Sequence, residues 1–164
     1  MIFQTLEQKR ARFAYESVSK VKEEKSEIQK KYSSYVKSSP VMILSNGLAN
    51  TLAFYLSKMK LKDDTDYKIV LRELENYKNN QPNKFENKSD RIAYAYLYTH
   101  ISVWLAKKSN DGKGLTEGYD PLKYIIEKAD VFKVMQLTQE ATALLNWMKR
   151  FADAMLEKEK EVEY

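Results

Sequence analysis

The sequence predicts an all-α fold, and three observations support this. Hydrophobic residues make up 43% of the 164-residue chain, and they recur at helical spacings of three and four. Only 4 Gly and 3 Pro are present, whereas an all-β domain of this size needs more turn residues. No repeat or long linker divides the chain. We therefore predict a single domain over residues 1–164, a compact bundle of about six helices with long N-terminal and C-terminal helices.

The N-terminal pattern predicts one long helix over 2–39. Its apolar spacing weakens across the polar stretch 22–27, which is either a solvated part of one helix or a break between two. Ser39-Pro40 is typical of a helix start, with Ser39 as the N-cap and Pro40 at the first helical position. A second helix, over 40–59, is predicted to follow.

The predicted helix 40–59 has two faces. Its apolar face is assigned to the core and contains Val41, Leu44, Leu48, Leu52, Tyr55 and Met59. Its opposite face is small and polar and contains Asn46, Gly47, Asn50, Ala53 and Ser57. Because glycine costs a helix about 1 kcal/mol relative to alanine, Gly47 indicates a close approach of another backbone or a local distortion. The neighbour on this face is another helix of the chain or another protein.

The middle of the chain predicts two further helices and two loops. Asp64 or Thr65 caps the third helix, and the polar segment 79–90 is a loop. The fourth helix covers 90–108. The segment 109–120 is predicted to be a loop because it contains three of the four glycines.

The C-terminal part predicts the last two helices. Asp120-Pro121 opens the fifth helix, and Thr138 caps the sixth. The core face of this last helix contains Ala141, Leu144, Leu145, Met148, Phe151, Ala152 and Met155. The charged tail 157–164 is expected to fray.

Residue types that carry catalysis or bind metals are scarce. Cysteine is absent, which excludes disulfides, thiolate metal sites and a cysteine nucleophile. His100 is the single histidine; it lies on the edge of an amphipathic helix and is interpreted as a packing residue between core and surface rather than a catalytic base. The sequence carries no metal or cofactor motif, so we predict no metal site, no cofactor and no enzyme. Without a signal peptide or a transmembrane pattern, a cytoplasmic protein is the simplest expectation.

The basic side chains suggest a surface for nucleic acid. The net charge of +5 is compatible with RNA or DNA and equally with an ordinary lysine-rich surface. On the predicted helix 2–39, Lys9, Lys20 and Lys31 fall on one line, with Arg12 on the same side. The alternative is a solvated helix face of charge pairs.

Two arginines stand out. Arg10 projects from the apolar stripe of the first helix, so it needs a carboxylate or carbonyl partner unless this end faces another molecule. Arg150 points away from the core of the last helix and neighbours Trp147. This pair fits a protein interface or a nucleic-acid clamp, or else Trp147 covers the seam with a neighbouring helix.

Three stretches resemble one known family, and together they span almost the whole chain. They are RARFAYESV near the N-terminus, KYSSYVKSSPVMILSNGLANTLAFYLSK in the middle and TQEATALLNWMKRFADAML near the end. They are similar to the small α-helical subunit of the type III-B (Cmr) CRISPR effector complex, a ribonucleoprotein of antiviral defense. The resemblance implies a helical bundle without nuclease activity, copies of which stack into a filament beside the guide–target RNA duplex.

The resemblance also implies roles for residues of the matched stretches. Those expected to bind RNA are Arg10, Arg12, Lys149 and Arg150, and charge geometry adds Lys20 and Lys31. Those expected to contact neighbouring subunits or helices are Asn46, Gly47, Asn50 and Trp147. The expected partners are the other subunits of the complex, copies of this chain and the RNA. The alternative is a stand-alone helical protein–protein adaptor without RNA contact.

Overall fold

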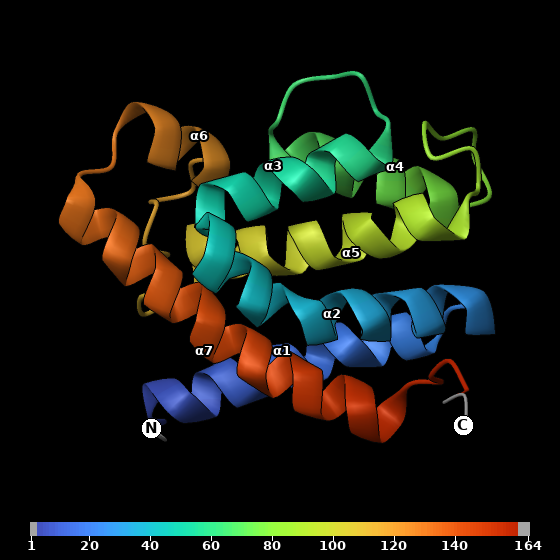
Figure 1. The fold of residues 1–164 in the computed structure, drawn as a ribbon, viewed down its shortest axis with the longest axis horizontal. Coiled ribbons are helices and arrows are strands. Elements are labelled where there is room, and N and C mark those ends of the chain that lie inside the picture. Colours follow the sequence, from blue (N-terminus) through green and yellow to red (C-terminus); the bar gives the residue numbers. More distant parts are fainter. Residues whose placement is uncertain (1–2, 161–164) are drawn as a thin grey trace.

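Seven α-helices and one π-helical turn form the computed structural model, which describes residues 3–160 (Figure 1). No strand occurs in that range, which confirms the all-α prediction. The elements are α1 (Leu6–Lys22), α2 (Ser26–Asn46), α3 (Leu48–Met59), α4 (Tyr67–Lys78), α5 (Ser89–Val103), the π-helical turn Trp104–Lys108, α6 (Pro121–Glu127) and α7 (Val131–Met155).

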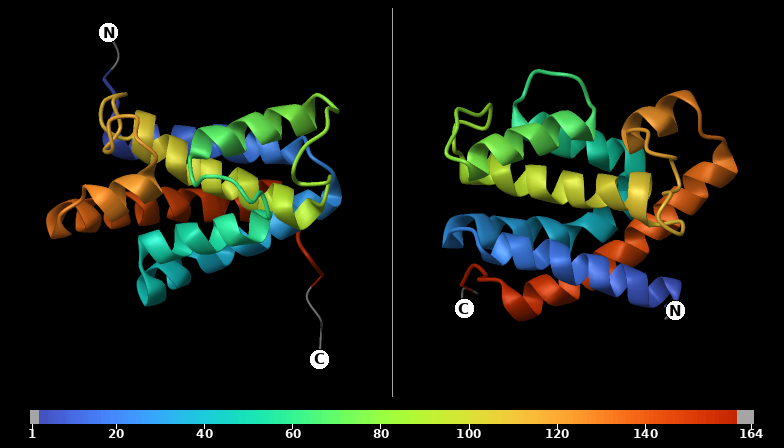
Figure 2. Two further views of the ribbon diagram at one scale, coloured as in Figure 1. Left: turned by 90° about the horizontal axis from the view of Figure 1, so that it is seen from above. Right: turned by 180° about the vertical axis from the view of Figure 1, so that it is seen from behind.

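The helices form two groups, and α5 belongs to one group and packs against the other. In Figure 1, α3, α4 and α5 lie on one side, while α1, α2 and α7 lie on the other. Helix α5 packs against α2, α3 and α4, and it is buried without interruption from Ala95 to Ser102. Helix α7 crosses both α1 and α2, and Figure 2 shows α1 beside α7 when the molecule is seen from behind. Segments from the two ends of the sequence are therefore brought together.

The predicted long helix over 2–39 is wrong, because the chain reverses between α1 and α2. The reversal is fixed by Glu24, which accepts hydrogen bonds from the hydroxyl groups of Tyr96 (2.6 Å) and Tyr77 (3.0 Å). The Nε2 atom of Gln29 donates to the backbone carbonyl of Lys22, the last residue of α1 (3.0 Å), and to that of Glu24 in the turn (2.8 Å). The polar stretch is thus a turn held by distant tyrosines, which is the second of the two alternatives.

The predicted helix start at Ser39-Pro40 is also wrong. Pro40 lies inside α2, and the hydroxyl of Ser39 donates to the carbonyl of Tyr35 (2.7 Å) instead of capping a new helix. The break falls at Gly47, whose φ of 84° and ψ of 161° are accessible almost only to glycine. An added Cβ there would meet nothing within 4 Å, so Gly47 serves a local distortion rather than a close approach.

This break changes the two faces predicted for residues 40–59. Val41 and Leu44 are 65% and 87% exposed, so their assignment to the core was wrong. The remaining four apolar residues of that face, Leu48, Leu52, Tyr55 and Met59, are buried as predicted. The difference arises because Gly47 turns α3 away from the direction of α2.

Helix caps decide the other boundaries. Asp66, rather than Asp64 or Thr65, caps α4. Asp120 caps α6 with Pro121 in its first turn, as predicted. Asp130 caps α7, so the predicted cap at Thr138 is wrong.

Thr138 lies inside α7, where its hydroxyl donates to the carbonyl of Val134 (2.7 Å). The predicted core face of α7 is confirmed at Ala141, Leu144, Leu145, Met148 and Ala152, whereas Phe151 and Met155 are half-buried. Residues 161–164 of the tail predicted to fray lie outside the described residues.

The π-helical turn and the loop after it form one unit. The backbone amides of Leu115 and Thr116 donate to the carbonyl of Leu105 (2.7 and 3.2 Å), and that of Gly118 donates to Ala106 (2.7 Å). Gly114 passes so close that a Cβ there would lie 2.0 Å from the Ala106 carbonyl carbon. We name this unit the loop clasp. It fixes the start of α6 relative to α5.

Candidate nucleic-acid interface

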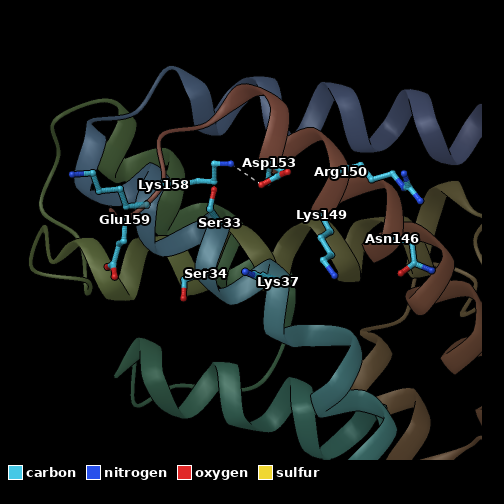
Figure 3. Close-up of a pocket in the computed structure, with 11 residues that line it drawn as sticks. Ser33, Ser34, Lys37, Asn146, Lys149, Arg150, Asp153, Lys158 and Glu159 are labelled. Carbon is cyan, nitrogen blue, oxygen red and sulfur yellow. Dashed lines mark hydrogen bonds and ion pairs between the residues drawn. The ribbon is translucent and has the colours of Figure 1, made fainter. Parts of the chain in front are cut away.

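A pocket of about 850 Å³ opens where α2 and α7 cross (Figure 3). Its side chains come from both helices and from the segment that follows α7. They are Lys30, Ser33, Ser34, Lys37, Asn146, Lys149, Arg150, Ala152, Asp153, Lys158 and Glu159. We call it the basic pocket, because five of these residues are Lys or Arg and two are Asp or Glu.

Helical spacing explains why these residues share one wall. On α2, Lys30, Ser33 or Ser34, and Lys37 follow one another at intervals of three or four residues. On α7 the same spacing joins Asn146, Lys149 or Arg150, and Asp153. The opposite side of each helix is apolar and packs into the core, so the crossing turns two polar faces toward one space.

The charge of the basic pocket is only partly neutralised. Asp153 accepts a hydrogen bond from the Nζ atom of Lys158 (2.8 Å). This contact, together with the charges of Lys37 and Lys149, lowers the pKa of Asp153 below its ordinary value. Within residues 3–160, no ion pair involves Lys30, Lys37, Lys149 or Arg150. Such cations remain available to an anionic ligand.

Arg10 lies elsewhere and is paired within the fold. Its Nε and terminal nitrogen atoms donate to Glu140 on α7 (2.7 and 2.6 Å), and a further nitrogen donates to Glu7 (3.0 Å). The hydrogen bond with Glu140 raises the pKa of Arg10. The indole nitrogens of Trp104 and Trp147 donate to Glu140 (2.9 Å) and Glu7 (2.7 Å). We call this set the closed network.

The remaining predicted RNA-binding residues lie outside the basic pocket. Arg12 pairs with Glu16 (3.1 Å) on the outer face of α1, and Lys31 pairs with Glu27 (3.5 Å) on α2. Lys20 lines a smaller pocket of about 440 Å³ beside the start of the reversal. The predicted line of lysines does not form, because Lys20 and Lys31 belong to different helices.

The residues predicted to contact subunits divide into two cases. Asn46, Gly47 and Asn50 are exposed at the corner between α2 and α3, next to the exposed Leu44. Trp147 is half-buried, donates to Glu7 and stacks on Phe151 with ring centroids 5.9 Å apart. It therefore covers a seam between α1 and α7, which was one of the alternatives for this residue.

His100 is a packing residue, but it lies deeper than the edge position expected, buried against the rings of Tyr32 and Tyr96. The hydroxyl of Tyr32 contacts its Nδ1 atom at 2.8 Å. Burial, with smaller contributions from the charges of Lys20 and Lys78, lowers the pKa of His100 to about 3. The imidazole is therefore neutral at neutral pH.

Two broader features complete the description of residues 3–160. No group of three or more His, Cys, Asp or Glu residues there has the arrangement of a metal site. None of the helices described combines the length and apolar character needed to cross a membrane.

Lys30 and Lys37 were missed by sequence reasoning. Both lie on the polar side of α2, seven residues apart, which is two helical turns. This heptad spacing was a usable signal for one basic wall. The second wall is formed by α7. Its position depends on how α7 crosses α2, which local sequence patterns do not predict.

The described residues thus form an all-α bundle that carries a basic pocket where α2 and α7 cross. A family model described as "CRISPR-associated protein (Cas_Cmr5)" matches residues 6–155. The chain therefore belongs to the Cas_Cmr5 family, the small subunit of type III-B CRISPR complexes. Other subunits of that complex are accordingly its partners.

Proposed function

We propose that this chain is a non-catalytic small subunit that contributes its basic pocket to the phosphates of the guide–target RNA duplex in antiviral RNA silencing. The observation that carries the proposal is a group of four cations on α2 and α7, in a member of the Cas_Cmr5 family, that form no ion pair within residues 3–160. They are Lys30, Lys37, Lys149 and Arg150. Two helices that meet at this site hold the cations on a rigid frame. Such a frame suits contact with a regular phosphate backbone.

The chemistry of the site fits positioning rather than reading of bases. Lys and Arg side chains neutralise phosphates and release condensed counterions, which gives binding that is independent of sequence and weakened by salt. Base pairing with the guide would then carry the specificity. Lys149 and Arg150 join Lys30 and Lys37 as the central contacts, while Arg12, Lys20 and Lys31 remain peripheral candidates. Arg10 is left out because Glu140 and Glu7 satisfy it.

We further propose that the exposed corner between α2 and α3 contacts neighbouring subunits, including copies of this chain stacked into a filament. The corner carries Asn46, Gly47 and Asn50 together with the 87% exposed side chain of Leu44. A small polar surface beside an exposed apolar side chain is suited to close packing by another protein. A place in the cytoplasm, where the complex would meet RNA, follows from this role.

The charge reversal Arg150→Glu tests the RNA contact. Because Arg150 is exposed on α7, the substitution should change the free energy of unfolding by no more than about 0.5 kcal/mol. It should weaken binding of an RNA duplex, by the assembled complex and by the isolated chain, about tenfold at low salt. Affinity measured across salt concentrations should also show a smaller salt dependence than in the unaltered protein.

Arg72→Glu is the matched control, since Arg72 is exposed on α4 and does not line the basic pocket. Equal RNA affinities for the two variants would contradict the proposal and leave a subunit that contacts only protein. A complex that lacks this chain yet binds and cuts target RNA normally along the whole guide would contradict it as well.

A further inference from the structure

We infer that the basic pocket recognises the ribose 2′-hydroxyl groups of RNA as well as its phosphates, so that it binds RNA more tightly than a backbone without these hydroxyls. The inference rests on the proposed function, because it concerns the ligand of the same pocket. Lysine and arginine neutralise the phosphates of any nucleic acid. The neutral polar side chains of the lining, which are Ser33, Ser34 and Asn146, are therefore the groups that can favour RNA.

These three side chains have hydrogen-bonding groups without partners. Within residues 3–160, none of them takes part in a hydrogen bond. Ser34 and Asn146 are exposed, whereas the Oγ atom of Ser33 is buried and still lacks a partner. A buried hydroxyl in this state is unfavourable until a ligand or a water molecule supplies the missing bond. The pocket is thus able to hydrogen-bond a polar ligand at more than its charged groups.

Other hydroxyls on the same two helices are satisfied locally. A serine or threonine in a helix can donate to a carbonyl of the preceding turn. The hydroxyl of Ser38 on α2 does so with Tyr35 (3.1 Å), and that of Thr142 on α7 does so with Thr138 (2.9 Å). The free hydroxyls of Ser33 and Ser34 are therefore a property of the pocket and not of every serine on these helices.

The neutral groups flank the cations of the pocket. In Figure 3, the lining residues Ser34, Lys37, Lys149 and Asn146 follow one another in this order across the view. A hydroxyl thus comes first, two cations follow, and an amide comes last. The RNA backbone has the same alternation, because each phosphate lies between two riboses. A phosphate bound by Lys37 and Lys149 would place neighbouring 2′-hydroxyls on the sides of Ser34 and Asn146.

The chemistry of these groups suits a 2′-hydroxyl. That hydroxyl both donates and accepts hydrogen bonds, and it distinguishes RNA from DNA at a binding site. A serine hydroxyl and an asparagine amide also donate and accept, so either can pair with it in both directions. The shape of the duplex contributes to recognition as well, and a test must therefore keep the shape constant.

The test compares two A-form duplexes of one sequence, an RNA duplex and a duplex in which fluorine replaces every 2′-hydroxyl. Binding of each to the full chain is measured for the unaltered protein and for the double variant Ser34→Ala/Asn146→Ala. The unaltered protein should prefer the RNA duplex about fivefold, and the double variant should lose most of this preference. The salt dependence of binding should stay the same, because no charge is removed.

Ser38→Ala/Gln136→Ala is the matched control. It removes a serine from α2 and an amide from α7, and both residues are exposed and outside the lining of the basic pocket. Both double variants should fold, because alanine has the highest helix propensity. The control should keep the preference for the RNA duplex.

Three results would overturn the inference. They are equal affinities of the unaltered protein for the two duplexes, a full preference in Ser34→Ala/Asn146→Ala, and an equal loss of preference in the control. If Arg150→Glu still weakens RNA binding in that case, the proposed function stands and the pocket contacts phosphates alone. If Arg150→Glu has no effect, the proposed function fails and the inference fails with it.

Discussion

The closed network and the basic pocket both involve α7, and both were candidates for RNA contact because of their arginines. In the closed network, Glu140 lies opposite Arg10 and satisfies it with two hydrogen bonds. In the basic pocket, Arg150 meets no carboxylate within the described residues. The difference lies in the partner across the helix crossing and not in the arginine.

This contrast separates charges that hold the fold together from charges that we propose to bind RNA. A partly buried ion pair is costly to break, because one charge then remains without a partner. An open cation costs the fold little and stays free to bind an anion. Substitutions in the closed network should therefore act on stability, and those in the basic pocket on RNA affinity.

The largest expected effect at neutral pH is on stability, from Glu140→Ala. This substitution removes the acceptor of two Arg10 hydrogen bonds and of the indole nitrogen of Trp104, so the free energy of unfolding should fall by about 3 kcal/mol. Urea denaturation measures the loss. Glu16→Ala is the control, because the Arg12–Glu16 pair is exposed and such pairs contribute little. Similar losses for both variants would remove the distinction between closed and open charges.

The next effect appears only in acid and concerns the other buried polar pair, Tyr32 and His100. Because burial lowers the pKa of His100 from 6.5 to about 3, protonation favours the unfolded chain. The contribution of His100 to the free energy of unfolding is complete above pH 6.5. It should decline by about 1.4 kcal/mol per pH unit below that value, down to about pH 3. Denaturation of the unaltered chain and of His100→Gln between pH 4 and 8 checks this, and identical slopes would refute it.

The smallest expected effect comes from Arg12→Gln, which tests how far the RNA surface extends. Arg12 is 69% exposed and paired with Glu16 on α1, outside the basic pocket. RNA affinity should fall less than about twofold, and stability should hardly change. A loss as large as that of Arg150→Glu would mean that the outer face of α1 belongs to the RNA surface. The proposed RNA surface would then include α1 as well as the basic pocket.

The parts of the fold that could be predicted from sequence are those with strong local patterns. The core face of α7 was predictable because its apolar residues repeat over many turns, and Leu144, Leu145 and Met148 are buried accordingly. Asp120-Pro121 was a reliable helix start because a cap and a proline act within one turn. Both signals depend only on residues close in the chain.

The failures have long-range causes. The reversal after α1 is held by Tyr77 and Tyr96, which lie 53 and 72 residues from Glu24. The partner of Arg10 is 130 residues away. Gly47 shows the opposite error. Its local signal for a distortion was correct, but the apolar residues around it favoured one continuous helix over 40–59. The basic pocket shares the first difficulty, since its two walls come from separate helices.

The loop clasp bears on the order in which this chain folds. The hydrogen bonds from Leu115 to Leu105 and from Gly118 to Ala106 close segments of only ten and twelve residues. Short closures lose little chain entropy, whereas the contact of Arg10 with Glu140 must wait for a very long one. We expect α5 and its clasp to serve as an early nucleus onto which the two ends of the chain later dock. The closed network and the basic pocket, which both include residues of α7, would then be the last parts to form.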